Sequence, residues 1–413
     1  MTSTSSATVR SFTWRTPVVL VLCACCISVL SFGPRSSLGF FMTPLSSTNG
    51  WGRDVFALAI AIQNLLWGLG QPLAGAISDK FGAPRVLSAG VLMYALGLYL
   101  TAHAATPGLL YLSAGVLIGF GLSGCAVPTV IGALGKLLPD SWRTLAFGAV
   151  TAAGSFGQFL FSPLAVGLMD QYGWQTTLVI FSCLMLLVVP ISLTLMAPKR
   201  PVLSTTPPPA QSLQQALAEA FGHRSYVLLV LGFFTCGFQL AFVTVHLPSY
   251  LIDRGLSAQV GGWTLATIGL FNIVGSLGSG YLATFLPKRY ILSFIYFARA
   301  LSVLAFILLP ASPVITLIYG AITGLLWLST VPPTSGLVAL MFGTRWLTML
   351  FGFAFFSHQV GGFLGVWLGG IAFERTGSYD VIWWLSILFG VLSAVINLPI
   401  VEKPVQRLAP APS

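Results

Sequence analysis

The sequence predicts an all-α membrane protein with twelve transmembrane helices in two six-helix halves, and three observations support this fold class. First, 56% of the 413 residues are hydrophobic and only 7% are charged, whereas a soluble domain carries roughly 25% charged residues. Second, the apolar residues fall into runs of about 20, the length that crosses a bilayer. Third, the two halves of the chain repeat each other.

The apolar runs give the expected order of the helices. Their centres lie near residues 30, 65, 95, 120, 155, 183, 238, 272, 299, 325, 358 and 388. The first run follows a polar N-terminus, is too long for a signal-peptide core and lacks a clear small-residue cleavage site, so we expect a retained helix. The six cysteines lie inside apolar runs without metal-ligand spacing, which indicates packing residues and predicts no metal or cofactor.

The distribution of basic residues predicts the orientation. With the N-terminus inside, fourteen basic residues fall on the cytoplasmic side: Arg10, Arg15, Lys80, Arg85, Lys136, Arg143, Lys199, Arg200, Arg224, Lys288, Arg289, Arg345, Lys403 and Arg407. Only Arg53, Arg254 and Arg375 fall outside. This bias predicts an inner-membrane protein with both termini in the cytoplasm, and it explains the net charge of +10 without a nucleic-acid partner.

One long polar stretch divides the chain into an N-terminal half (1–196), a cytoplasmic linker (197–225) and a C-terminal half (226–413). The linker begins with a proline-rich segment that favours extended backbone. Its second part, SLQQALAEAF, has helical spacing and is expected to lie along the membrane surface.

The halves are related by a repeat. SWRTLAFG at 141–148 matches RWLTMLFG at 345–352, and the same offset pairs Pro128 with Pro332 and Asp170 with Glu374. Such repeats are typical of alternating-access carriers, in which the substrate binds between the halves near the bilayer midplane.

A short loop, GAISDKFGAPR at 75–85, follows the second predicted helix. We expect a tight turn in which Gly75 allows close helix approach, Gly82 turns the chain, and Asp79 pairs with Lys80, Arg85 or a neighbouring loop. The pattern resembles the signature loop of the major facilitator superfamily, and the resemblance extends over essentially the whole chain. It implies that Gly75, Asp79, Lys80, Gly82 and Arg85 form a gating loop. The second copy, GYLATFLPKRY at 280–290, has Thr284 in place of the aspartate.

Within that superfamily, the segment GWGRDVFALAIAIQNLLWGLGQPLAGAISDKFG and the glycine-rich fifth and eleventh helices are similar to the bacterial branch related to monocarboxylate transporters and oxalate/formate exchangers. The eighth helix, LFNIVGSLGSG, lacks the arginine that monocarboxylate transporters carry there. The fifth helix lacks the glycine-proline pattern of drug/proton antiporters. The substrate of this chain therefore cannot be inferred from the substrates of that branch.

Only two charged residues remain at mid-membrane, Arg35 and Arg299, and no acidic residue lies there. A buried cation without a counter-ion favours an anionic ligand, and guanidinium binds carboxylate in a bidentate manner. Pro34 predicts a kink beside Arg35, where Ser31, Ser36 and Ser37 add donors. Alternatively, Arg35 snorkels outward or binds carbonyls of a neighbouring helix. Arg299 lies on the ninth helix, which is peripheral in this fold, so a structural role is at least as well supported as substrate contact.

Uncharged polar residues supply further candidates. His358 and Gln359 lie in the middle of the eleventh helix, where the histidine can bind a carboxylate, carry a proton or be a satisfied core residue. The other candidate substrate contacts are Gln63, Gln239 and Asn272, and Asn64 lies among the polar groups of the second helix. Pro332 and Pro333 predict an irregular, cavity-lining break in the tenth helix. His246 is expected near the membrane interface.

These observations predict a monomeric secondary transporter for a small organic anion, most closely a monocarboxylate, coupled to protons or to a counter-anion. A carrier of a larger aromatic or amphipathic solute, such as a vitamin or a drug, is the alternative, because tryptophan and phenylalanine are plentiful. An enzyme is disfavoured because the predicted spans contain no carboxylate pair and no histidine cluster. A sensor is disfavoured because no soluble domain is appended.

Overall fold

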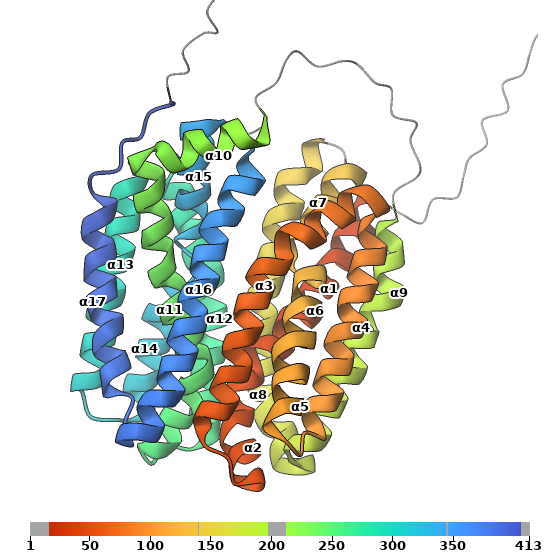
Figure 1. The fold of residues 1–413 in the computed structure, drawn as a ribbon, viewed down its shortest axis with the longest axis vertical. Helices are drawn as coiled ribbons and strands as arrows, with labels where there is room; N and C mark the ends of the chain where they lie inside the picture. Colours follow the sequence, from red (N-terminus) through yellow and green to blue (C-terminus); the bar gives the residue numbers. More distant parts are fainter. Residues whose placement is uncertain (1–15, 139, 197–211, 344–345, 406–413) are drawn as a thin grey trace, which may run out of the picture.

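The computed structural model describes residues 16–138, 140–196, 212–343 and 346–405 (Figure 1). Within these ranges the chain consists of helices and their connections, without strands. The all-α fold class predicted from composition and hydropathy is therefore confirmed.

The N-terminal half contains α1 (Pro17–Ser37), η1 (Leu38–Phe41), α2 (Met42–Asn49), α3 (Arg53–Phe81), α4 (Ala83–Ala102), α5 (Pro107–Leu110), η2 (Tyr111–Leu117), α6 (Ile118–Cys125), α7 (Val127–Leu137), α8 (Asp140–Leu186), α9 (Val188–Ser192) and η3 (Leu193–Leu195). The rest contains α10 (Leu213–Gly222), α11 (Arg224–Asp253), α12 (Ala258–Leu282), α13 (Lys288–Leu308), α14 (Pro313–Leu326), α15 (Val331–Phe342), α16 (Leu347–Thr376) and α17 (Asp380–Asn397). The helical spacing of SLQQALAEAF corresponds to α10, whose N-terminus is closed by a capping box between Ser212 and Gln215.

Eleven segments of the described chain are long and apolar enough to cross a membrane. One of them, Ala146–Leu195, has 50 residues and is long enough to cross twice, because a helix rises about 1.5 Å per residue. It contains the centres predicted for both the fifth and the sixth helix. The sequence predicts two separate helices here, and the structure confirms them, because the backbone leaves the helical conformation at Gly173, whose φ of 78° gives the left-handed turn that glycine favours.

Two predicted interruptions have different outcomes. In the tenth span, α14 ends at Leu326 and α15 begins at Val331, so the break expected near the double proline is confirmed. In the first span, by contrast, α1 continues through Pro34 to Ser37, and the regular helix gives way only afterwards to the 3₁₀ turn η1. The irregular segment therefore lies one turn beyond the proline.

The two halves pack together mainly through α3 against α16 and α8 against α12. Figure 1 shows α3 and α16 side by side at the centre of the molecule. Small residues permit this approach: a Cβ added at Gly68 lies 2.8 Å from the Gln359 Cβ, and one added at Gly269 lies 2.8 Å from the Ser155 carbonyl oxygen. We call the end that holds α2 and α5 the Arg53 end and the opposite end, with α7, α10 and α15, the linker end.

Candidate functional site

Arg35 is buried near the end of α1 and has one side-chain hydrogen-bond partner among the described residues. Its exposed fraction is 6%, and its Nη2 donates to the Oδ1 of Asn64 on α3 at 2.7 Å. Its Nε is buried and has no hydrogen-bond partner among the described residues. The one ion pair found among the described residues lies elsewhere, between Arg53 and Asp253. Arg35 is thus a buried cation next to a neutral amide, with donor capacity left over.

Asn64 brings the Arg35 guanidinium to the boundary between the halves. On the α16 side, a Cβ added at Gly362 lies 3.6 Å from the Asn64 Cγ. Gly68 lies one turn beyond Asn64 on α3 and faces Gln359, which lies one turn before Gly362 on α16. Because α3 and α16 belong to different halves, Arg35 and Asn64 of the N-terminal half and Gln359 of the C-terminal half lie on adjoining helical turns across this boundary. We call these three residues the Arg35 site.

The Arg35 site is rich in unused donors. Besides Arg35 Nε, the amide nitrogens Asn64 Nδ2 and Gln359 Nε2 are buried without a hydrogen-bond partner among the described residues. Asn64 and Gln359 are each only 2% exposed. Leaving such a donor unpaired costs about 1 to 3 kcal/mol. A ligand that offers only acceptors, as a carboxylate does, is the chemical complement of these groups.

His358 lies beside this site. Its Nδ1 is 3.1 Å from the Gln359 Oε1, and its ring stacks on Phe355 with the centroids 5.8 Å apart. The aromatic wall continues across the boundary, where Trp67 of α3 meets Phe355 at 5.6 Å in an edge-on arrangement. The eleventh span therefore supplies an amide, an imidazole and an aromatic surface.

The serines next to Arg35 do not all remain available. Ser36 and Ser37 both donate to the carbonyl of Gly33 within their own helix, at 2.7 and 3.2 Å. These two contacts correct the expectation that they serve as donors beside Arg35. Ser31 Oγ, in contrast, is buried without a hydrogen-bond partner among the described residues.

Arg299 is held entirely differently. It is 1% exposed on α13, and its guanidinium donates to Gln239 Oε1 at 3.2 Å, to the Leu326 carbonyl at 2.5 Å and to the Trp327 carbonyl at 2.9 Å. Both carbonyls lie where α14 stops, so Arg299 satisfies acceptors released by the break in the tenth span. Gln239 is engaged as well, since its Nε2 donates to the Ser386 carbonyl. This pair lies within the C-terminal half, away from the Arg35 site.

The structure also separates the remaining candidates. Gln63 donates to the Ala114 carbonyl at 2.7 Å inside the N-terminal half. Asn272 bridges the halves, because its Nδ2 donates to Ser155 Oγ at 2.9 Å and its Oδ1 accepts from the Leu328 main chain. His246, which the sequence predicts near the membrane–water interface, is fully buried within the protein, and its Nε2 lies 2.8 Å from the Val366 carbonyl.

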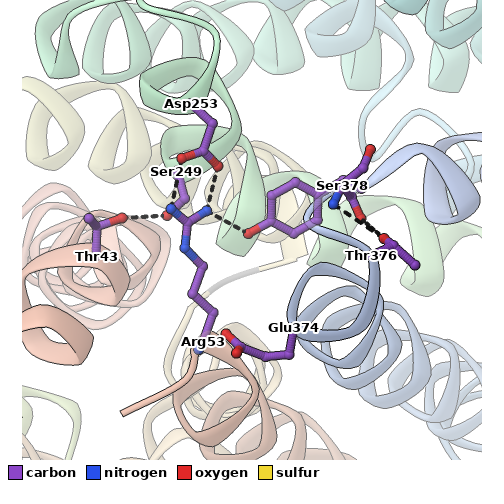
Figure 2. Close-up of polar contacts among 8 residues, drawn as sticks. Thr43, Arg53, Ser249, Asp253, Glu374, Thr376 and Ser378 are labelled. Carbon is purple, nitrogen blue, oxygen red and sulfur yellow. Dashed lines mark hydrogen bonds and ion pairs between the residues drawn. The ribbon is translucent and has the colours of Figure 1, made fainter. Parts of the chain in front are cut away.

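A second cluster closes the Arg53 end (Figure 2). Arg53, at the start of α3, makes a bidentate contact with Asp253 of α11 at 2.5 and 2.8 Å. Its Nη1 also donates to the Tyr379 hydroxyl at 3.1 Å, and its guanidinium lies 4.0 Å from the centre of the Phe373 ring. We call these four residues, together with Glu374, the Arg53 clasp.

The clasp joins main chain as well as side chains. The Arg53 main-chain N–H donates to Glu374 Oε1 at 2.6 Å, so a carboxylate of the C-terminal half caps the N-terminus of α3. The repeat partner of Glu374 is Asp170, and Asp170 accepts from Gln259 at the start of α12 at 3.0 Å. Burial raises the pKa of the Tyr379 phenol to about 12, with Arg53 acting in the opposite direction, so its oxygen stays a neutral acceptor near pH 7.

Comparison with known proteins identifies the family. Residues 24–366 match the Major Facilitator Superfamily. The chain belongs to this superfamily. Its members are carriers, so the protein is a multi-pass membrane transporter and not an enzyme. Among the described residues, no group of three or more His, Cys, Asp or Glu side chains is arranged to hold a metal ion.

Relatives of the chain share its length as well as its family. An uncharacterized MFS-type transporter, YcxA of Bacillus subtilis, is 29% identical over 89% of this chain and 91% of its own length. Monocarboxylate transporter 13 of Rattus norvegicus is 26% identical over 87% and 83%. Monocarboxylate transporter 11 of Mus musculus is 26% identical over 88% and 82%. The resemblance to the monocarboxylate transporter branch agrees with these names.

Solved structures of the superfamily share the fold. The inward-facing, unoccupied structure of a bacterial homologue of the human lysosomal transporter Spinster has a TM-score of 0.75 at 15% identity, covering 96% of this chain and 99% of the other. A D-xylose-proton symporter has a TM-score of 0.73 at 15% identity, covering 95% and 99%. Both likenesses confirm the major facilitator fold.

The superfamily's signature loop is described only in part. The side chains of Asp79 and Lys80 lie outside the described residues. Gly82 ends α3 with a φ of 91°, in agreement with the predicted turn, and Arg85 Nη1 donates to the Phe81 carbonyl at 3.4 Å. No described atom lies within 4 Å of a Cβ added at Gly75, so the close approach expected there is not observed.

Sequence reasoning missed two features of the site. Asn64 was grouped with the polar residues of the second helix, and only its neighbour Gln63 was selected as a substrate contact. The helical face was the available indication, since Asn64 lies one turn from Gly68 and so shares its face toward the other half. The clasp partners of Arg53 are 200 residues or more distant in sequence and had no local pattern to reveal them.

Proposed function

We propose that this transporter carries a small organic anion, most closely a carboxylate, by alternating access, and that Arg35 binds the anionic group. The single observation that supports this best is the set of unused donors on Arg35, Asn64 and Gln359. A carboxylate accepts from all three and lets the guanidinium form charge-assisted hydrogen bonds of about 1.5 to 3 kcal/mol. The relatives named monocarboxylate transporters support the same substrate class.

The transport cycle follows from the position of the site between the halves. With the Arg53 clasp formed, the halves are joined at the Arg53 end, and an anion bound at Arg35 exchanges with the linker end. Opening of the clasp and separation of α3 from α16 at that end expose the same site to the opposite side. The anion, held by residues of both halves, biases the equilibrium through the contacts it makes in each state.

We also propose an orientation of the protein in the membrane and a coupling of transport to protons or to a second anion. The excess of basic residues at the linker end favours a cytoplasmic location for that end and for both termini, in the inner membrane of a bacterial cell. His358, in contact with Gln359, is the candidate proton carrier, and exchange against a second anion is the other form of coupling. The chain acts as a monomer.

The aromatic wall beside the site supports one alternative. Trp67 and Phe355 meet one turn from Asn64 and Gln359, and they offer a flat apolar surface to an aromatic or amphipathic solute such as a vitamin or a drug. Competition separates the two substrates: benzoate inhibits the uptake of a small carboxylate strongly if the wall contacts the ligand, and acetate inhibits it if the carboxylate alone is recognised.

Uptake of radiolabelled acetate, lactate, pyruvate and benzoate into proteoliposomes tests the proposal. We expect Arg35→Ala to abolish uptake and Arg35→Lys to raise the KM about tenfold or more, because the ammonium keeps the charge but not the planar fork. Arg254→Gln removes an exposed cation at the Arg53 end and serves as the matched control. Unchanged uptake in both Arg35 variants contradicts the proposed anion contact.

A further inference from the structure

The second copy of the signature loop forms a basic pocket at the linker end. Residues 283–289, between α12 and α13, and residues 401–403, after α17, surround a cavity of about 470 Å³. Lys288, Arg289 and Lys403 supply three positive charges to its wall. Its one acid, Glu402, is engaged, because its Oε1 accepts from the Arg289 main-chain N–H at 2.8 Å. The three basic side chains outnumber the one carboxylate, so the pocket carries a net positive charge.

A second cavity lies on the adjacent bilayer-facing surface. It measures about 370 Å³ and lies along α13 and α17. Its lining is aromatic and aliphatic, with Phe294, Phe297 and Val395 among its residues. Phe294 is 67% exposed and Val395 56% exposed. Both helices are apolar enough to span the membrane, so these exposed side chains face the lipid. This cavity is an apolar groove open to the lipid.

Arg289 and Tyr290 join the basic pocket to the apolar groove. Arg289 lines the pocket, Tyr290 lines the groove, and Arg289 Nη2 donates to the Tyr290 hydroxyl at 3.1 Å. The Arg289 Nε is buried without a hydrogen-bond partner among the described residues, so one donor of the guanidinium stays unused at the junction. The basic pocket and the adjoining apolar groove thus form one continuous amphipathic surface.

We infer that the basic pocket and the apolar groove together bind an anionic phospholipid, with its headgroup phosphate at Lys288, Arg289 and Lys403 and an acyl chain along α13 and α17. Arginine and lysine donate charge-assisted hydrogen bonds to phosphate, and each basic residue near the membrane surface contributes about 1 kcal/mol to the attraction of anionic lipid. A soluble phosphate would use the pocket alone. The groove next to it favours the lipid.

The divergence of the repeat fits this role. Where the first copy of the loop has Asp79, the second has Thr284, so no carboxylate of the loop neutralises its lysine and arginine. The next residues are Phe285 and Leu286, which are 59% and 44% exposed and extend the apolar surface toward the bilayer. The second loop therefore has no acid at the position of Asp79 and instead binds a lipid of one leaflet, which anchors the C-terminal half to that leaflet.

Lipid binding to the purified full-length protein tests the inference. Native mass spectrometry is used to count bound phosphatidylglycerol and phosphatidylcholine of identical acyl chains, together with the shift in melting temperature that each lipid causes. We expect phosphatidylglycerol to be retained selectively and Lys288→Gln and Lys403→Gln to weaken it about fivefold each, since about 1 kcal/mol is lost per charge. Val395→Trp, which fills the groove, should reduce retention of both lipids.

Two comparisons keep the test specific. Arg254→Gln removes one charge at the Arg53 end and should leave lipid retention unchanged, and the melting temperature of every variant in phosphatidylcholine shows that it is folded. Glycerol phosphate should fail to displace the lipid. Equal retention of the two lipids by the unaltered protein, full retention by the double lysine variant, or displacement by glycerol phosphate would each overturn the inference.

Discussion

The two buried arginines of the membrane interior, one in each half, differ in how their donors are used. Arg299 donates to three acceptors, two of them main-chain carbonyls at the break between α14 and α15. Arg35 donates to one amide oxygen only, while the Nε of each arginine is buried without a hydrogen-bond partner among the described residues. The first stabilises an irregular backbone, whereas the second has capacity for a ligand. Depth in the membrane alone therefore does not distinguish the two arginines, and we propose the number of satisfied donors as the property that does.

The largest effect is expected from removing Arg299. Arg299→Leu leaves the Leu326 carbonyl and the Gln239 Oε1 without a donor in an apolar interior, at about 1 to 3 kcal/mol for each group, and leaves the Trp327 carbonyl with only the weak Cys236 thiol donor at 3.9 Å. We expect the variant to accumulate poorly and to unfold at a clearly lower temperature in detergent. Arg35→Leu strands only the Asn64 amide oxygen and removes an underused cation, so its melting temperature should stay close to that of the unaltered protein.

Thermal unfolding of the two variants side by side checks this contrast. If Arg35→Leu lowers the melting temperature as much as Arg299→Leu does, both arginines are structural and the distinction fails.

Much of the fold could be predicted because it depends on local composition. Apolar runs mark the spans, and the double proline at 332 and 333 marks the break in the tenth span, since proline removes a backbone donor. The polar stretch DQYGWQTT at 170–177 likewise marks the boundary between the fifth and sixth spans, where Gly173 makes the left-handed turn.

The site was only partly predictable, for a different reason. The charge census selects both Arg35 and Arg299, because both are cations in apolar runs, and only the position of Arg299 on the ninth helix weakens its case as a substrate contact. Which donors are satisfied depends on helices distant in sequence, such as the 29 residues between Arg35 and Asn64 or the 28 between Arg299 and Trp327. The packing of helices within each half decides these contacts, and no local pattern encodes it.

An intermediate effect is expected when Arg35 is given an internal counter-ion. Asn64→Asp places a carboxylate where the amide oxygen now accepts at 2.7 Å, which gives Arg35 a charged partner within the protein. We expect the affinity for a carboxylate substrate to fall about tenfold or more, because the guanidinium is neutralised by its own protein and the added charge repels the anion. The measurement is the KM of carboxylate uptake in proteoliposomes.

Asn64→Leu provides the matched control, since it removes the amide without adding charge. Its KM should rise less than that of Asn64→Asp, because Arg35 loses an orienting contact but keeps its charge free for the substrate. Equal effects of the two substitutions would show that Asn64 acts only through packing, and normal uptake by Asn64→Asp would remove Arg35 from the binding site.

The smallest effect is expected at the Arg53 clasp, which extends the comparison from buried to half-exposed arginines. The Arg53 and Asp253 side chains are 14% and 32% exposed, so solvent screens their attraction and the pair is worth about 1 kcal/mol or less. Asp253→Asn should therefore open the Arg53 end by no more than about fivefold, since the main-chain contact to Glu374 remains.

The reporter is Ser249→Cys in a cysteine-free background, because Ser249 is buried against Thr43 at this end. Its rate of alkylation by a membrane-impermeant maleimide measures opening. Exchanging the charges, Arg53→Asp with Asp253→Arg, should restore part of the closed population but not all of it, because Tyr379 and Phe373 contact the arginine only from its present position. An alkylation rate that is the same with and without Asp253 would mean that the packing of α3 against α16, and not the clasp, holds this end closed.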